Sequence, residues 1–313
     1  MKKSNLIRIL SSFTQNEIRE FSDYISSTFF NKNKGVIKLY TYLKKNYPAF
    51  KEELLTKSSV WAAVFPGNEY NDGLLRIQIF TLTNLATDYL RYKAMNIDKI
   101  QSGNQLLRIL NNRNLDKQFE KTSKQVELDL NAGGLQSERL FYNMYVYEYE
   151  NVFYQHKRYF DRKEKLIGIK GIRNIAHYAT LFQVIVMLKT YLYFLNTRQL
   201  YETSAETAEF EEFIRNLDIK KYDSHPVVPL LYHTIKLHTD EDNSLHFKYI
   251  RNTLLEQFEK LPSHDSVEVI INMENYCKRM IRKGRNEYTK HLFDIYNFEL
   301  EHKTYKSELS LSE

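Results

Sequence analysis

The chain has 313 residues and a formal net charge of +6, so it is long enough for one large domain or two ordinary ones. It contains only 9 glycines and 5 prolines, which argues against a loop-rich or all-β chain and favours helices. The single cysteine, Cys277, excludes an intrachain disulfide and a cysteine-rich zinc site. It indicates a reducing compartment, and we expect a cytoplasmic protein.

The first clear helix start is a capping box, formed by Thr14 and Glu17. Apolar residues then recur every three or four positions and predict a buried face: Ile18, Phe21, Ile25 and Phe29. A basic, asparagine-rich corner follows, and a second helix runs to about Tyr47. We interpret this corner as the packing of two helices with a solvated basic face. A nucleic-acid surface is the alternative.

Helical periodicity continues through the middle of the chain, with predicted helices at 72–95, 104–112, 115–131 and 136–158. The last of these is the most aromatic stretch, and its aromatic residues recur every four positions: Phe141, Tyr145, Tyr149 and Phe153. A stripe with this spacing is typical of a buried core face. We therefore predict that it packs inside the protein.

The segment 175–196 is apolar and long enough to span a bilayer. It carries Lys189 near its middle, and a lysine at that depth costs about 2.5–3.5 kcal/mol. We therefore predict a buried central helix and no membrane span. Further helices are predicted at 226–238, 243–260, 264–283 and 286–303, and we divide the chain into an N-terminal helical module, 1–96, and a helical-repeat region, 97–313, with a soft joint near 202.

The two last predicted helices, joined at Gly284, resemble a degenerate tetratricopeptide repeat. The resemblance covers about 264–300 and implies that Phe293 packs the second helix on the first. It is partial, because Asn286 and Thr289 stand where the family prefers tyrosine and alanine. Such repeats bury their faces by stacking on neighbours. The fold that the resemblance implies is an all-α solenoid of stacked antiparallel helix pairs.

The N-terminal stretch "REFSDYISSTFFNKNKGVIKLYTYLKK", followed by "VFPGNEYNDGLLR", carries a second resemblance. It is similar to an uncharacterised family of long helical-repeat proteins from Bacteroidota-type bacteria. The resemblance implies an architecture that continues in further repeats, and it implies no activity and no functional residues.

Motifs of the common enzyme classes do not occur in the sequence: there is no glycine-rich phosphate loop, no G-x-S-x-G and no HExxH. Histidines concentrate between His225 and His264, but His233 and His238 are five residues apart and diverge on one helix. We interpret the histidines as surface or capping residues, and Cys277 as a small core residue. We therefore predict a non-enzymatic protein with no catalytic residue, no metal and no cofactor.

Two basic clusters are the remaining functional candidates. One lies at 157–173, close to Tyr154, and aromatic side chains among cations can stack on unpaired bases. Its candidate nucleic-acid contacts are Arg158, Arg162, Lys163 and Lys165. The other crowds the end of a helix at 278–285, where cations are favoured. The acidic stretches 202–212 and 240–242 could instead pair with these clusters.

The predicted function is a scaffold for protein–protein interaction, and a nucleic-acid-binding helical protein is the alternative. The last predicted helix has apolar residues around much of its circumference, including Tyr296 and Phe298. A terminal solenoid helix normally has a polar outer face. We therefore expect this helix to be covered by further repeats, a second copy or a partner protein, with Tyr296 and Phe298 as candidate contacts.

Overall fold

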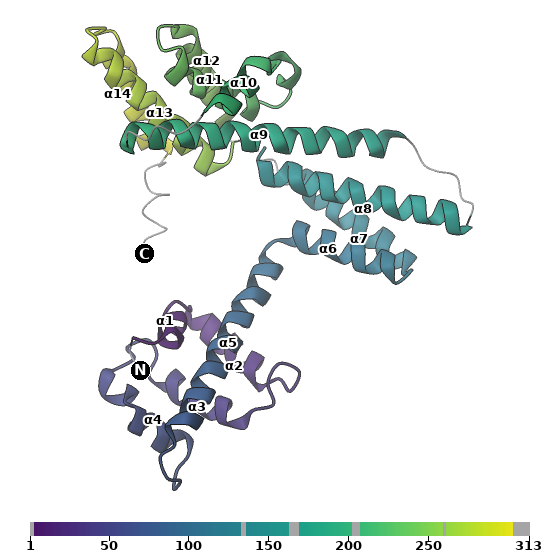
Figure 1. Ribbon diagram of the computed structural model, residues 1–313, viewed down its shortest axis with the longest axis vertical. Coiled ribbons are helices and arrows are strands. Elements are labelled where there is room, and N and C mark those ends of the chain that lie inside the picture. The colour runs from purple at the N-terminus through teal and green to yellow at the C-terminus, as the bar shows by residue number, and fades with distance from the viewer. Residues whose placement is uncertain (1–2, 133–135, 163–168, 202–206, 259–260, 303–313) are drawn as a thin grey trace. The chain divides into compact units, whose positions relative to one another are not determined.

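The computed structural model describes residues 3–132, 136–162, 169–201, 207–258 and 261–302 (Figure 1). Every regular element among these residues is helical, with fourteen α-helices and two short 3-10 helices. Packing occurs mainly between helices that are neighbours in the sequence. The predicted all-α class is therefore confirmed, together with the packing of neighbouring helix pairs.

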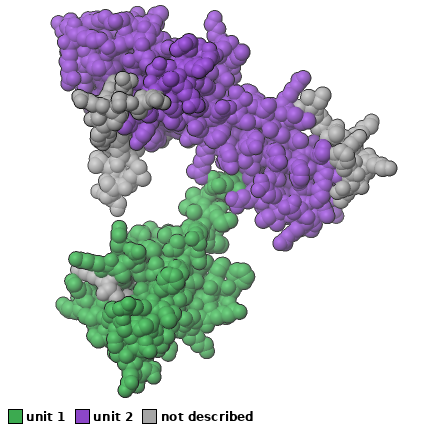
Figure 2. All heavy atoms as spheres, in the orientation of Figure 1, with its two compact units in different colours: residues 1–102 green, residues 103–313 purple. Residues whose placement is uncertain are grey.

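The chain forms two compact units, unit 1 at residues 1–102 and unit 2 at residues 103–313 (Figure 2). The boundary predicted from the sequence lies between residues 96 and 97. The soft joint near residue 202 lies outside the described residues.

Unit 1 is built around one long helix, α5, which contacts four shorter helices of the unit. The helices of unit 1 are α1 (Asn5–Ser11), α2 (Gln15–Ser26), α3 (Lys34–Lys45), η1 (Glu52–Leu55), α4 (Lys57–Val64) and α5 (Asp72–Ile97). The predicted capping box starts α2: Glu17 N–H donates to the Thr14 hydroxyl at 3.2 Å, and Thr14 N–H donates to the Glu17 carboxylate at 2.8 Å. The rings of Phe21, Tyr40 and Tyr89 are fully buried at the centre of the unit.

The corner between α2 and α3 differs from the prediction at Phe29. Helix α2 ends at Ser26, so Phe29 lies beyond the helix and is 87% exposed. The buried residue of the corner is Asn31, whose amide donates to the Ile25 carbonyl at 2.9 Å. The predicted stripe holds for Ile18, Phe21 and Ile25 and is wrong for Phe29, because helical spacing carries no meaning past the end of the helix.

Unit 2 starts within α6, which crosses the boundary, and continues through a series of packed helices. They are α6 (Lys99–Asn112), α7 (Asp116–Ala132), α8 (Glu138–Arg162), α9 (Ile169–Tyr201), α10 (Ala208–Asn216), η2 (Ile219–Tyr222), α11 (Val227–Thr239), α12 (Ser244–Gln257), α13 (Ser263–Arg282) and α14 (Tyr288–His302). Helix α8 lies along α9, α11 packs on α9, α12 and α13, and α13 packs on α14 (Figure 1).

Helix α9 supplies the centre of the main core of unit 2. It is long and apolar enough to cross a membrane by length and composition alone, but Leu181, Ile185 and Leu188 are buried against other helices of the unit. The Lys189 ammonium lies between two carboxylates, 2.5 Å from Glu138 Oε2 on α8 and 2.5 Å from Asp265 Oδ1 on α13. Lys189, the residue that makes a membrane span costly, therefore joins α8, α9 and α13 inside unit 2.

The aromatic stripe of α8 is only partly buried. Phe141 is buried, whereas Tyr149 and Phe153 are exposed to nearly half of their full area. The face of α8 toward α6 and α7 carries Tyr154 instead, which stacks on Phe119 at a ring-centroid distance of 3.6 Å. The prediction that the stripe is buried is therefore wrong for Tyr149 and Phe153, because α8 turns a different aromatic face to its neighbours.

Candidate functional site

In the C-terminal helix pair, a tight turn at Gly284 joins α13 to α14. Gly284 has φ of 85°, a left-handed conformation that favours glycine. Its N–H donates to the Ile281 carbonyl at 2.9 Å, and Arg285 N–H donates to the Met280 carbonyl at 3.0 Å. These two bonds satisfy the last carbonyls of α13 as in a Schellman motif, so the predicted helix–turn–helix at Gly284 is present.

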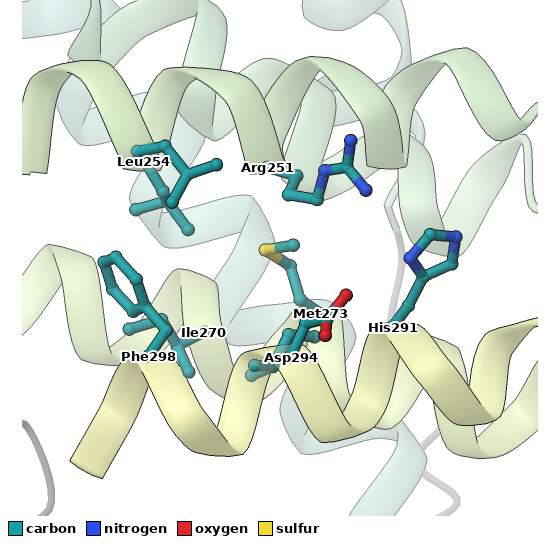
Figure 3. Close-up of a pocket in the computed structure, with 9 residues that line it drawn as sticks. Arg251, Leu254, Ile270, Met273, His291, Asp294 and Phe298 are labelled. Carbon is teal, nitrogen blue, oxygen red and sulfur yellow. The ribbon is translucent and has the colours of Figure 1, made fainter. Parts of the chain in front are cut away.

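A groove opens between α12 and α14, with α13 as its floor (Figure 3). It encloses about 240 Å³. Most of its lining is apolar and comes from all three helices: Leu254, Leu255, Ile270, Met273, Ile295 and Phe298. Leu255 lies at the mouth and is 63% exposed, whereas Met273 is buried in the floor. The groove therefore presents an apolar surface that solvent reaches from one side.

One end of the groove is polar, where Arg251 of α12 faces His291 and Asp294 of α14 (Figure 3). The Nε of Arg251 and the Nδ1 of His291 are buried, and neither has a hydrogen-bond partner in the described part of the chain. A buried polar atom without a partner costs about 1–3 kcal/mol. This end of the groove therefore holds two atoms whose hydrogen bonds a ligand can complete.

Burial lowers the pKa of His291, and the nearby Arg251 charge lowers it further. Its ring also lies against two aromatic rings, 5.2 Å from Phe247 and 5.6 Å from Tyr288 between centroids. His291 is therefore neutral at pH 7, and among the described residues that line this groove Arg251 is the only cation.

The two predicted contact residues of α14 point in different directions. Phe298 lines the groove, and its ring meets that of Phe258, the residue that follows α12, at 5.1 Å in an edge-to-face arrangement. Tyr296 is on the outer side of α14, 39% exposed, with the Lys278 ammonium 5.7 Å from its ring. Phe293 and Leu300 are still more exposed and lie with Tyr296 on the outer face of α14.

The tetratricopeptide resemblance misplaced Phe293. The residues of α14 that are buried are Tyr288 and Ile295, which are seven positions apart and share one face. Phe293 is two positions from Ile295 and so points away from that face, at 63% exposed. The expectation that it packs on the preceding helix is therefore wrong.

The basic cluster at the end of α13 is paired within unit 2. Arg279 Nε lies 2.8 Å from Glu241, Lys283 pairs with the same carboxylate, and Arg285 lies 2.8 Å from Asp242. The alternative pairing with the acidic stretch 240–242 is therefore what the structure shows for Arg279, Lys283 and Arg285, whereas Lys278 pairs with Glu274 and Arg282 is exposed.

The other basic cluster is described only in part. The Arg158 guanidinium lies 3.4 Å from the centroid of the Tyr154 ring, pairs with Asp116 and has a side chain only 13% exposed. The side chain of Arg162 lies outside the described residues, as do Lys163 and Lys165. The nucleic-acid contact at these residues stays a prediction, and Arg158 is held by an internal ion pair.

The histidines on α11 and α12 are more buried than the predicted surface or capping positions. His233 Nδ1 and His246 Nδ1 are 2.7 Å apart, and His246 Nε2 is 3.0 Å from the Asp240 carboxylate. Burial lowers the pKa of His233 to about 4, with a contribution from His246. No group of three or more metal-binding side chains occurs among the described residues.

Cys277 is completely buried in the core of unit 2, as expected for a small core residue. Burial raises the pKa of its thiol to about 12. The thiolate that nucleophilic chemistry requires is therefore absent at neutral pH.

Sequence reasoning missed the groove and its polar end. The lining residues come from positions as far apart as Arg251, Met273 and His291. Neither spacing nor motif links them, so the sequence alone carries no signal that would have found them.

No family model matches the chain, and no curated protein or solved structure is significantly similar to it. The two resemblances seen in the sequence are therefore supported only at the level of an all-helical architecture with sequential packing of helix pairs.

Proposed function

We propose that the protein is a non-enzymatic, cytoplasmic scaffold of stacked, tetratricopeptide-like helix pairs that binds a partner protein at its C-terminal helix pair. The observation that carries this proposal is the open apolar groove between α12 and α14. Grooves of this kind bind apolar side chains that a partner presents on a helix or an extended segment.

Solvent-exposed apolar area around the groove supports the same proposal. Leu255 at the mouth and Phe293 and Leu300 on the outer face of α14 are each more than 60% exposed. Burying a large apolar side chain contributes about 1.5–3 kcal/mol. A partner that covers the groove and part of this face therefore gains enough free energy to bind.

The test is affinity purification of the tagged full chain from its native cell, with and without nuclease, using two matched variants. Leu255→Glu puts a charge at the mouth of the groove. Leu245→Glu changes an equally exposed leucine on the same helix that does not line the groove. We expect the wild type and Leu245→Glu to retain a nuclease-resistant partner protein that Leu255→Glu loses.

Two outcomes contradict the proposal. If nuclease releases all bound material, the alternative nucleic-acid function is favoured. If both leucine variants behave alike, the groove is not the binding site. Light scattering of the purified chain separates a second copy from a different protein, because self-association through the groove raises the molar mass of the wild type and not of Leu255→Glu.

A further inference from the structure

The polar end of the groove restricts which partner segment fits it. The Nε of Arg251 has no hydrogen-bond partner among the described residues, although Asp294 lines the same end of the groove. A guanidinium in a partly buried site pairs most favourably with a planar carboxylate, which accepts two parallel hydrogen bonds. The unsatisfied Nε of Arg251 is one of the donors that such a pair uses.

The groove also selects against other charges. A cationic group at this end would meet the partly buried Arg251 guanidinium, where like charges repel more strongly than in open water. Asp294 lines the same end of the groove, so a partner segment with more than one carboxylate there would be repelled by it. One negative charge beside Arg251 and His291 is the arrangement that these three side chains favour.

The size of the groove indicates what accompanies the carboxylate. Its volume of about 240 Å³ is smaller than the ~300–1,000 Å³ of typical small-molecule sites. It matches one or two large apolar side chains, whose contacts would be Leu254, Ile270, Met273 and Phe298. A protein segment supplies such a side chain and a nearby carboxylate on one backbone.

We propose that the groove between α12 and α14 binds a partner segment in which an Asp or Glu lies within one or two residues of a large apolar side chain. The carboxylate pairs with Arg251 next to His291, and the apolar side chain packs over Met273. This proposal rests on the proposed function and adds the chemistry by which the partner is selected.

The experiment starts with random dodecapeptides displayed on phage and selected on the full chain at pH 7.5. The strongest peptide is then synthesised in two forms, with its acidic residue and with the corresponding amide, Glu→Gln or Asp→Asn. Binding is located by the NMR signal of the Met273 methyl group in protein labelled at its six methionines. We expect the acidic peptide to shift the Met273 signal and to bind at least tenfold more tightly than its amide form.

The matched protein variants are Arg251→Met and Arg282→Met. Arg282 is exposed in the last turn of α13 and does not line the groove. Arg251→Met should weaken the acidic peptide by about 10–100-fold, the range for a hydrogen-bonded charge pair, and leave the amide peptide unchanged. Binding of the amide peptide also shows that Arg251→Met is folded. Arg282→Met should change neither affinity by more than about twofold, as expected for a solvated charge.

The outcomes separate the two proposals. If peptides shift Met273 but the acidic and amide forms bind equally, or if Arg251→Met behaves like Arg282→Met, the acidic partner is wrong and the proposed protein-binding groove stands. If no selected peptide shifts Met273, both proposals are wrong.

Discussion

At the scale of single residues, the buried charges of unit 2 are more informative about its stability than its apolar side chains. Asp265 is almost completely buried, and the Lys189 ammonium is its ion-pair partner. Burial raises the pKa of Asp265, while the hydrogen bond and charge of Lys189 act in the opposite direction. Replacing Lys189 removes that compensation and leaves a buried carboxylate next to Glu138.

We predict that Lys189→Met lowers the free energy of unfolding by about 3–5 kcal/mol at pH 7, as expected when one partner of a buried pair is removed. Asp265 then has a folded pKa further above its unfolded value, so the variant loses stability as pH rises through that folded pKa. The loss should therefore be smaller at pH 5 than at pH 7. Urea denaturation at both pH values measures it, with Lys248→Met as an exposed control. An equal effect of the two substitutions would show that the pair is not stabilising.

His233 gives a second pH-dependent prediction. Its pKa in the folded protein is lowered to about 4 from 6.5 by burial, then by His246 and Lys236. The stability that this neutral histidine contributes is present above pH 6.5 and is lost as pH falls toward 4. We expect His233→Gln to reduce the decline of the urea midpoint between pH 7 and pH 4.5. The control variant His264→Gln, at an exposed histidine, should leave that decline unchanged. An equal change in both variants would contradict this prediction.

At the scale of helices, the turn between α13 and α14 depends on one backbone conformation. Gly284 has φ of 85° and no atom within 4 Å of where a Cβ would be placed. The cost of a side chain there is therefore conformational and not steric. We predict that Gly284→Ala lowers the free energy of unfolding by about 1 kcal/mol and that Gly284→Asn costs less, because asparagine tolerates the left-handed region. Chemical denaturation of the full chain measures both, and equal losses would contradict this account.

Helix starts were the most predictable feature of the chain, because each rests on a local hydrogen bond. The capping box at Thr14 was predicted, and the side chains of Thr14, Thr56 and Asn71 each accept a backbone N–H at the start of a helix. Which face of a helix is buried was predictable only where one stripe was apolar, as in α2. In α8 and α14 apolar residues occur around the helix, so Phe153 and Phe293 were placed inside and are exposed.

The candidate site could not be predicted from the sequence for a related reason. Tyr296 and Phe298 were chosen together, but only Phe298 lines the groove and Tyr296 lies on the outer face. They are two positions apart, so a helix turns them by about 200°. Residues that meet across the groove belong to three helices, and their pairing depends on packing that no local pattern encodes.

At the scale of the whole molecule, the chain has two large hydrophobic cores, one in each unit. Among the described residues, no buried residue belongs to both cores. Cooperative unfolding depends on shared packing, so the two units should unfold as separate transitions. The single tryptophan, Trp61, reports the unfolding of unit 1 directly, because it is buried in that unit. Its indole N–H donates to the Asn68 carbonyl at 3.0 Å.

We predict that Leu188→Ala, in the core of unit 2, shifts the urea transition seen by circular dichroism and leaves the transition of Trp61 fluorescence unchanged. The matched substitution in unit 1, Leu39→Ala, should shift the fluorescence transition. Both leucines are completely buried, and truncating such a side chain costs about 2–5 kcal/mol, which is large enough to separate the curves. The full chain is used in every measurement, so no fragment has to fold by itself. A shift of the Trp61 transition by Leu188→Ala equal to that seen by circular dichroism would mean that the two cores unfold as one unit.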